Sequence, residues 1–243
     1  MSQSVRRAAR IIDVIAEEPQ TVMELAEAFG LHRSTMFREL QALTEIGYVR
    51  RRRNGQYSLG MHFISLANQA RENLDLSRIA HDHIRRLHKA VGNTIHLAAL
   101  MEHNIVYVDK IEDAKGIRMY SRIGNTVMPY CSGVGKAILA DLGEEGRDAI
   151  LEPVTWERFT DSTILTRADL DRELEIIKRQ GFAVDDGEFE DLVNCVALPI
   201  RSSVGVVGAL SVTALRVIQD LDQLEARIPQ MQQTVDLISR ELG

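Results

Sequence analysis

Apolar residues recur at helical spacing through the first 46 residues and predict three helices there. The first covers residues 5–18. The second opens at a capping box, in which the side chains of Thr21 and Glu24 each bond the other residue's backbone N–H. A tight turn at Gly30 separates it from the third helix, which covers residues 32–46. The side chains expected to face a shared core are those of Val5, Ala8, Ile12, Ile15, Val22, Leu25, Ala26, Phe29, Phe37, Leu40, Leu43 and Ile46.

Two short strands follow these helices. They cover residues 48–52 and 56–59 and are joined across Asn54 and Gly55, a dipeptide typical of a tight β-hairpin. Two helices on either side of a tight turn have the spacing of a helix-turn-helix, and the hairpin after them then corresponds to its wing. An amphipathic stretch at residues 61–73 predicts a linker helix.

Beyond the linker, short strands alternate with helices. Neighbouring strands followed by helices favour an α+β domain, in which an antiparallel sheet packs against helices. The expected organisation is a winged helix-turn-helix over 1–61, a linker helix over 62–75 and a second domain over 76–243. The expected helices cover 74–91, 133–142, 170–180 and 221–242, the last starting or bending near Pro229, and the expected strands cover 94–101, 105–111, 117–123, 182–185, 194–200 and 206–213.

The charge of the chain is divided unevenly between these parts. The net charge is −6, yet residues 1–70 hold nine Arg, no Lys and seven acidic residues. Residues 71–243 hold 20 basic and 28 acidic residues. A small cationic module joined to a larger acidic one favours an N-terminal part that binds nucleic acid.

Composition narrows the class of protein. The chain is 45% hydrophobic and 26% charged, which excludes a mainly disordered or collagen-like protein. The two cysteines, Cys131 and Cys195, form no CxxC pair, so neither a disulfide framework nor a thiolate zinc site is expected. We expect a cytoplasmic protein, because the longest apolar run, near residues 204–215, is too short to span a membrane and no signal peptide is apparent.

The start of the third helix carries the residue types that read DNA. In a helix-turn-helix, the first residues of the second helix enter the major groove, where Arg bonds guanine and Ser or Thr bonds bases or phosphates. The wing adds a run of arginines suited to phosphate contact. The alternative is a solvated helix and a charged hairpin, but the capping box, turn glycine and basic wing together favour DNA. The expected DNA-binding residues are Arg33, Ser34, Thr35, Arg38, Arg51, Arg52 and Arg53.

The run TVMELAEAFGLHRSTMFRELQALTEIGYVRR resembles the winged helix-turn-helix of the IclR family of bacterial transcriptional regulators. Three later runs, MPYCSGVGKAILADL, GFAVDDGEFEDLVNCVALPI and GVVGALSVTA, resemble further segments of that family in the same order. The resemblance implies a C-terminal GAF-like effector-binding domain, a homodimer or homotetramer, and repression or activation of an operon. It places effector-contacting positions at Gly133, Val134, Asp185, Cys195, Ser211 and Thr213. The sequence departs from the family pattern at Gly187, which replaces the first of an acidic pair, and at Leu192, which replaces a glycine.

The residues themselves partly support such a pocket. Ser211 and Thr213 share one strand face, and hydroxyls on a covered face need partners that a ligand can supply. Gly133 and Gly135 expose N–H groups at the positive end of a helix, a natural carboxylate site. With no Arg or Lys nearby except Lys136, the pocket suits a small organic acid or a hydroxylated metabolite rather than a polyanion. The alternative is that the hydroxyls bond neighbouring backbone and that the glycines only make a turn.

Enzyme and metal sites are disfavoured by the motifs. The run around Lys136 lacks the first glycine and the Ser or Thr of a phosphate loop, and no GxSxG occurs. Cys195 has no histidine near it in sequence to activate it. Five of seven histidines lie between residues 81 and 103, but none pairs at metal-ligand spacing on a helix, so we expect no metal and no cofactor.

The leading hypothesis is therefore a sequence-specific transcriptional regulator that binds double-stranded operator DNA at an inverted repeat. An effector in the second domain would change that binding allosterically. The first alternative is an architectural or partner-recruiting DNA-binding protein with no small-molecule effector. The second is an enzyme with an appended winged helix.

Overall fold

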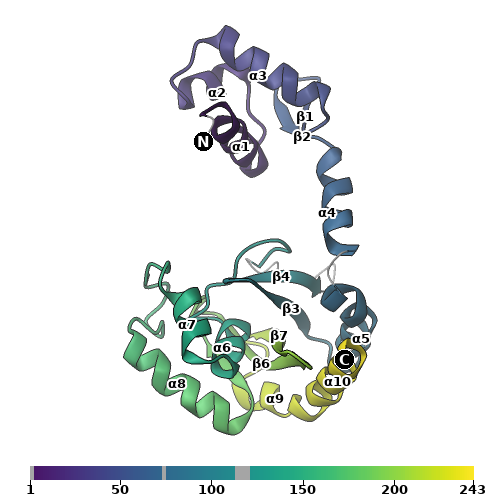
Figure 1. Cartoon of the computed structure of the whole chain (residues 1–243), viewed down its shortest axis with the longest axis vertical. Helices are drawn as coiled ribbons and strands as arrows, with labels where there is room; N and C mark the ends of the chain where they lie inside the picture. The colour runs from purple at the N-terminus through teal and green to yellow at the C-terminus, as the bar shows by residue number, and fades with distance from the viewer. Residues whose placement is uncertain (1–2, 73–74, 113–120) are drawn as a thin grey trace. The chain divides into compact units, whose positions relative to one another are not determined.

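The computed structural model describes residues 3–72, 75–112 and 121–243, and the chain forms two compact units over residues 1–73 and 74–243 (Figure 1). The fold is α+β. The first unit is a winged helix-turn-helix that ends in a further helix. Its elements are α1 (Gln3–Glu17), α2 (Val22–Ala28), α3 (Arg33–Glu45), β1 (Val49–Arg51), β2 (Tyr57–Leu59) and α4 (His62–Glu72).

Local signals in the sequence fix the helices of the first unit. Thr21 and Glu24 form the predicted capping box, with the Thr21 N–H 2.7 Å from the Glu24 carboxylate. Gly30, with φ of 62°, follows the end of α2 in the left-handed conformation that glycine adopts without strain. The core joins α1, α2, α3 and the wing, and its fully buried members include Ile11, Leu25, Met36, Leu40 and Val49.

Three apolar side chains expected in this core are exposed instead. Phe37 is 45% exposed, Ile46 is 58% exposed and Val5 is 67% exposed. In α3 the buried positions are Met36, Leu40 and Leu43, which lie four and three residues apart along one face. Phe37 points about 100° away from Met36 because each residue turns the helix by that angle.

The second unit is built on a five-stranded antiparallel sheet with strand order β4-β3-β7-β6-β5. α5, α9 and α10 pack on one face, and α6, α7 and α8 pack on the other (Figure 1). Its elements are α5 (Asp75–Val91), β3 (Thr94–Met101), β4 (Asn104–Ile111), α6 (Gly133–Asp141), α7 (Glu144–Leu151), α8 (Arg167–Gln180), β5 (Ala183–Asp186), β6 (Val193–Ser202), β7 (Gly205–Leu215), α9 (Leu221–Glu225) and α10 (Ile228–Leu242).

The second unit differs from the expectation in three places. α7 was not predicted, because only Ile150 and Leu151 of its eight residues are buried and its apolar pattern is weak. The helix expected over 221–242 is two helices, α9 and α10, but α10 starts beside Pro229, as expected, because a missing N–H is tolerated in the first turn. The strand expected at 117–123 lies mostly outside the described residues, and its described part, residues 121–123, is not a strand.

No helix within the described ranges combines the length and the apolar character that crossing a membrane requires.

Candidate ligand pocket and candidate nucleic-acid interface

A cavity of about 450 Å³ lies in the second unit between the start of α6, the strands β3 to β7 and the segment 121–128. All six residues expected to contact a ligand line it, although the last lies 80 positions after the first. They are Gly133, Val134, Asp185, Cys195, Ser211 and Thr213.

Strand pairing brings the polar side chains of the cavity onto one face of the sheet. Asp185 pairs with Cys195, and Cys195 pairs with Thr213. Two residues along β7, Ser211 pairs with His96 of β3. The alternation of a pleated strand therefore turns Ser211, Thr213 and His96 toward the same side, as the two-residue period of β7 predicted for its hydroxyls.

The start of α6 lies directly against this sheet because Gly133 has no side chain. A Cβ at Gly133 would lie 2.5 Å from the Cys195 sulfur, which is closer than any real contact. The Gly133 N–H donates to that sulfur, and the Ser132 hydroxyl, as the helix cap, accepts from the Gly135 N–H at 3.3 Å. The cavity therefore faces the positive end of a helix dipole, and Gly133 and Val134 line it there.

Asp185 is buried and lines the cavity. Burial, and then the nearby Glu188 charge, raise the pKa of its carboxyl to about 7. The carboxyl accepts the Glu188 N–H at 2.8 Å. Near neutral pH it therefore alternates between a charged acceptor and a neutral donor, and only the charged form repels a bound carboxylate.

Lys136 does not line the cavity. The expectation that its charge could meet a ligand there is therefore wrong. Its side chain is fully buried and bonds Glu188, with Glu173 at 3.5 Å. Burial alone would lower the pKa of Lys136, but these carboxylates raise it. The positive charge of Lys136 is therefore neutralised by carboxylates inside the protein. Among the described lining residues there is no Lys and no Arg.

His96 is the main lining residue that the sequence did not reveal. Burial, assisted by the Lys110 charge, lowers the pKa of His96 to about 3, so the ring is neutral. Its Nε2 lies 2.7 Å from the Ser121 hydroxyl, and its Nδ1 lies 3.2 Å from the Thr213 hydroxyl. The Tyr107 ring lies 5.5 Å away, centroid to centroid. Only the β3–β7 pairing, which aligns His96 with Ser211, could have indicated this residue.

Gly187 accounts for one departure from the family pattern. Its φ of 71° lies in the left-handed region, and a Cβ there would lie 2.6 Å from Arg216. Thr160 and Thr163 donate to the backbone carbonyls of Gly187 and Glu188 at 2.6 and 2.7 Å and hold this loop beside the cavity. A glycine rather than an acidic residue therefore suits the loop as it is built here.

Cys195 is not an activated nucleophile. Burial, and then the Asp185 charge, raise the pKa of its thiol, so the reactive thiolate is disfavoured. His96 lines the same cavity, but both of its ring nitrogens face hydroxyls. In the part of the chain that the structure describes, no three His, Cys, Asp or Glu side chains gather as metal ligands.

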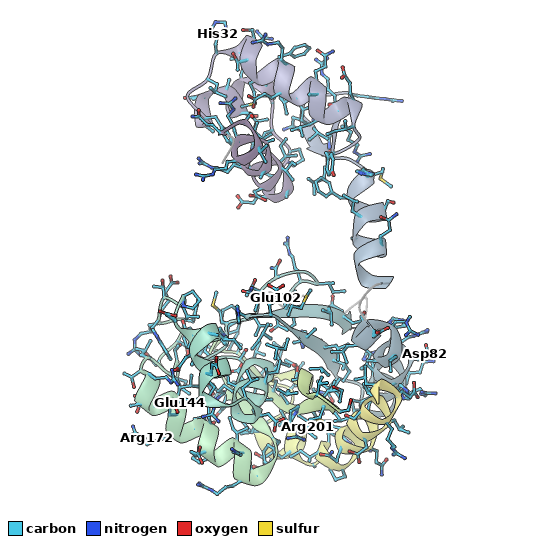
Figure 2. All side chains as sticks on the ribbon, viewed as in Figure 1. His32, Asp82, Glu102, Glu144, Arg172 and Arg201 are labelled. Carbon is cyan, nitrogen blue, oxygen red and sulfur yellow. The ribbon has the colours of Figure 1, made fainter. Side chains whose placement is uncertain are left out.

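Of the seven predicted DNA-contacting residues, Arg33, Ser34, Arg38 and Arg51 line one concave surface of the first unit, whereas Thr35, Arg52 and Arg53 do not line it. Arg33, Ser34 and Arg38 are exposed on α3, Thr35 is half-buried, and the three wing arginines are exposed. His32 caps α3, and its ring extends from the tip of the unit (Figure 2). A concave surface of about 710 Å³ joins the start of α3 to the wing, and its lining is Val22, His32, Arg33, Ser34, Phe37, Arg38 and Arg51.

Comparisons with known proteins agree across the chain. A model of the bacterial transcriptional regulator IclR C-terminal region matches residues 68–240, and a model of the IclR helix-turn-helix domain matches residues 4–53. The HTH-type transcriptional regulator KdgR of Escherichia coli is 32% identical over 99% of this chain and 92% of its own length. The crystal structure of the Thermotoga maritima IclR has a TM-score of 0.85 at 31% identity and covers 98% of both chains. An IclR homolog from Microbacterium hydrocarbonoxydans, complexed with 4-hydroxybenzoate, has a TM-score of 0.84 at 23% identity and covers 99% of both chains.

Proposed function

Since the chain belongs to the IclR family of bacterial transcriptional regulators, we propose that it binds an inverted-repeat operator and that a small organic acid in the cavity modulates this binding. The observation that carries the proposal is the convergence of six residues from four elements on one cavity at the positive end of α6. The relatives are regulators rather than enzymes, and the raised pKa of Cys195 supports the same interpretation here.

DNA recognition is proposed for the cationic face of the first unit. Arg33, Ser34, Thr35 and Arg38 enter the major groove at the start of α3 and contact bases. Arg51, Arg52 and Arg53 contact phosphates from the wing. Two copies of the chain, in a cytoplasmic homodimer or homotetramer, would place two such faces on the two halves of an inverted repeat.

The effector is proposed to be a small carboxylic acid that also carries a hydroxyl. Its carboxylate accepts from backbone N–H groups at the start of α6, where Val134 lines the cavity, and its hydroxyl bonds Asp185. Neutral His96, which bonds the Ser121 and Thr213 hydroxyls, adds a polar but uncharged side chain to the lining of the cavity. The 4-hydroxybenzoate of the Microbacterium homolog is an acid of this kind. The lack of Lys and Arg among the described lining residues disfavours phosphorylated ligands.

Two measurements test this function with the full chain. Selection from a random duplex library identifies the operator, and calorimetry with a panel of hydroxylated and plain carboxylic acids identifies binders. We expect one class of acid to bind wild type and to bind Ser211→Ala and Thr213→Val less tightly. We expect that acid to change operator affinity by about 5- to 150-fold. An operator whose affinity no bound acid changes would favour an architectural protein, and the absence of any selected sequence would contradict DNA recognition.

A further inference from the structure

The phenyl ring of Phe37 lies on the outer face of α3, although the apolar pattern of the sequence predicted that it faces the core. It is 45% exposed, whereas its neighbour Met36 is fully buried. Phe37 follows Arg33 by four residues, so the two side chains lie one turn apart on the same face. Single exposed apolar residues are common on proteins, so the meaning of this ring depends on what surrounds it.

The surroundings of Phe37 are cationic. It shares the concave surface of the first unit with Arg33, Arg38 and Arg51, and among the described residues of that lining only Val22 adds a second purely apolar side chain. A partner that fits this surface carries negative charge and also offers a small apolar group in reach of the ring. The edge of a DNA duplex in the major groove meets both conditions.

Among the four bases, only thymine presents a methyl group in the major groove, and aromatic side chains contact it. We propose that Phe37 contacts the C5-methyl group of one thymine in each half of the operator. The ring then specifies a thymine next to the positions read by the arginines on either side of it. This inference rests on the proposed binding of operator DNA through α3.

The test removes the methyl group from the DNA and nothing else. Operators are first selected from random duplexes with the full chain, and each thymine of a half-site is then replaced, one at a time, by deoxyuridine. We expect one position per half-site at which this replacement lowers the affinity of wild type by about fourfold. A loss of this size is expected when one methyl-sized apolar group is no longer buried at the interface.

Variants of the protein assign that loss to one side chain. Phe37→Ala binds the thymine and deoxyuridine operators with equal affinity, because the ring that senses the methyl is gone. Phe37→Leu keeps part of the difference, since its side chain is still apolar. Ile46→Ala is the matched control, because Ile46 is 58% exposed near the other end of the same helix and keeps the full difference. Circular dichroism confirms that each variant folds.

The outcomes separate this inference from the function on which it rests. A selected operator with no deoxyuridine-sensitive thymine would overturn the role of Phe37 and leave DNA recognition standing. The same follows if Phe37→Ala keeps the wild-type loss. A selection that enriches no sequence would overturn both.

Discussion

The two candidate sites of this chain use polar side chains in opposite environments. In the first unit, Arg33, Arg38 and Arg51 stand exposed on one surface, where water and salt screen each charge. In the second unit, Asp185 and His96 are buried, and both have pKa values far from their ordinary ones. Changes at the exposed face should therefore alter affinity and salt dependence with little effect on folding. Changes in the buried cavity should alter stability and pH dependence together with ligand binding.

The largest effect that sharpens this contrast is expected at the wing. Replacing Arg51, Arg52 and Arg53 together with Ala removes up to three phosphate contacts. The slope of log affinity against log salt should fall by about 2 to 3, and affinity for every duplex at 0.1 M salt should fall by about a hundredfold. The melting temperature should stay at the wild-type value. Fluorescence anisotropy across a salt series measures both quantities, and the exposed Arg172 of α8, replaced by Ala, is the control (Figure 2).

A smaller and more specific loss is expected at Arg38. Arg38→Ala should weaken operator binding by about 1–3 kcal/mol and relax the preference at one base position. Binding to random DNA should change much less, because one base contact rather than the general charge is lost. A variant that still separates operator from random DNA as wild type does would show that α3 is not the reading helix.

In the second unit, the close packing at Gly133 predicts a loss of stability and of ligand affinity. Gly133→Ala puts a methyl group 2.5 Å from the Cys195 sulfur, so α6 must move away from β6. We expect the second unit to lose about 1–3 kcal/mol of unfolding free energy and its ligand affinity, while the first unit still binds DNA. Gly143→Ala is the control, since nothing lies within 4 Å of an added Cβ there. Equal melting curves for the two variants would contradict the close approach of α6 to the sheet.

A pH-dependent effect is expected at Asp185. Its pKa of about 7 in the folded protein exceeds the value of about 3.9 in an unfolded chain. The folded state therefore binds the proton more tightly, and stability is lost as pH rises from about 4 through 7. The side chain of Asp185→Asn cannot ionise. The free energy of unfolding of this variant should therefore exceed that of wild type by about 1–3 kcal/mol at pH 8, and the two should be equal below pH 4. Denaturant unfolding at several pH values measures this, and Asp186→Asn, at an exposed neighbouring carboxylate, should show no such trend.

The features that could be predicted from the sequence are those that depend on residues close together along the chain. The capping box of Thr21 and Glu24 and the turn at Gly30 act within a few residues, so α2 and α3 could be placed from sequence. Two adjacent apolar residues, Met36 and Phe37, left the core face of α3 ambiguous, because the helical period fits either one.

The cavity shows the same limit at longer range. Resemblance to the family and the two-residue period of β7 indicated Ser211 and Thr213. His96 lies more than 100 positions earlier and joins them only through the pairing of β3 with β7. The charge of Lys136 is neutralised by Glu188, 52 positions away, which no local pattern signals.

The central claim is that a ligand bound in the cavity of the second unit controls DNA binding by the exposed face of the first unit. The direct measurement is the affinity of the full chain for its operator, with and without a saturating concentration of the acid found by calorimetry, for wild type and Thr213→Val. We predict that the acid changes wild-type affinity by at least about fivefold. For Thr213→Val the same change should need a higher concentration of acid, while affinity without acid stays at the wild-type value. An acid that binds the cavity and leaves operator affinity unchanged would contradict the account.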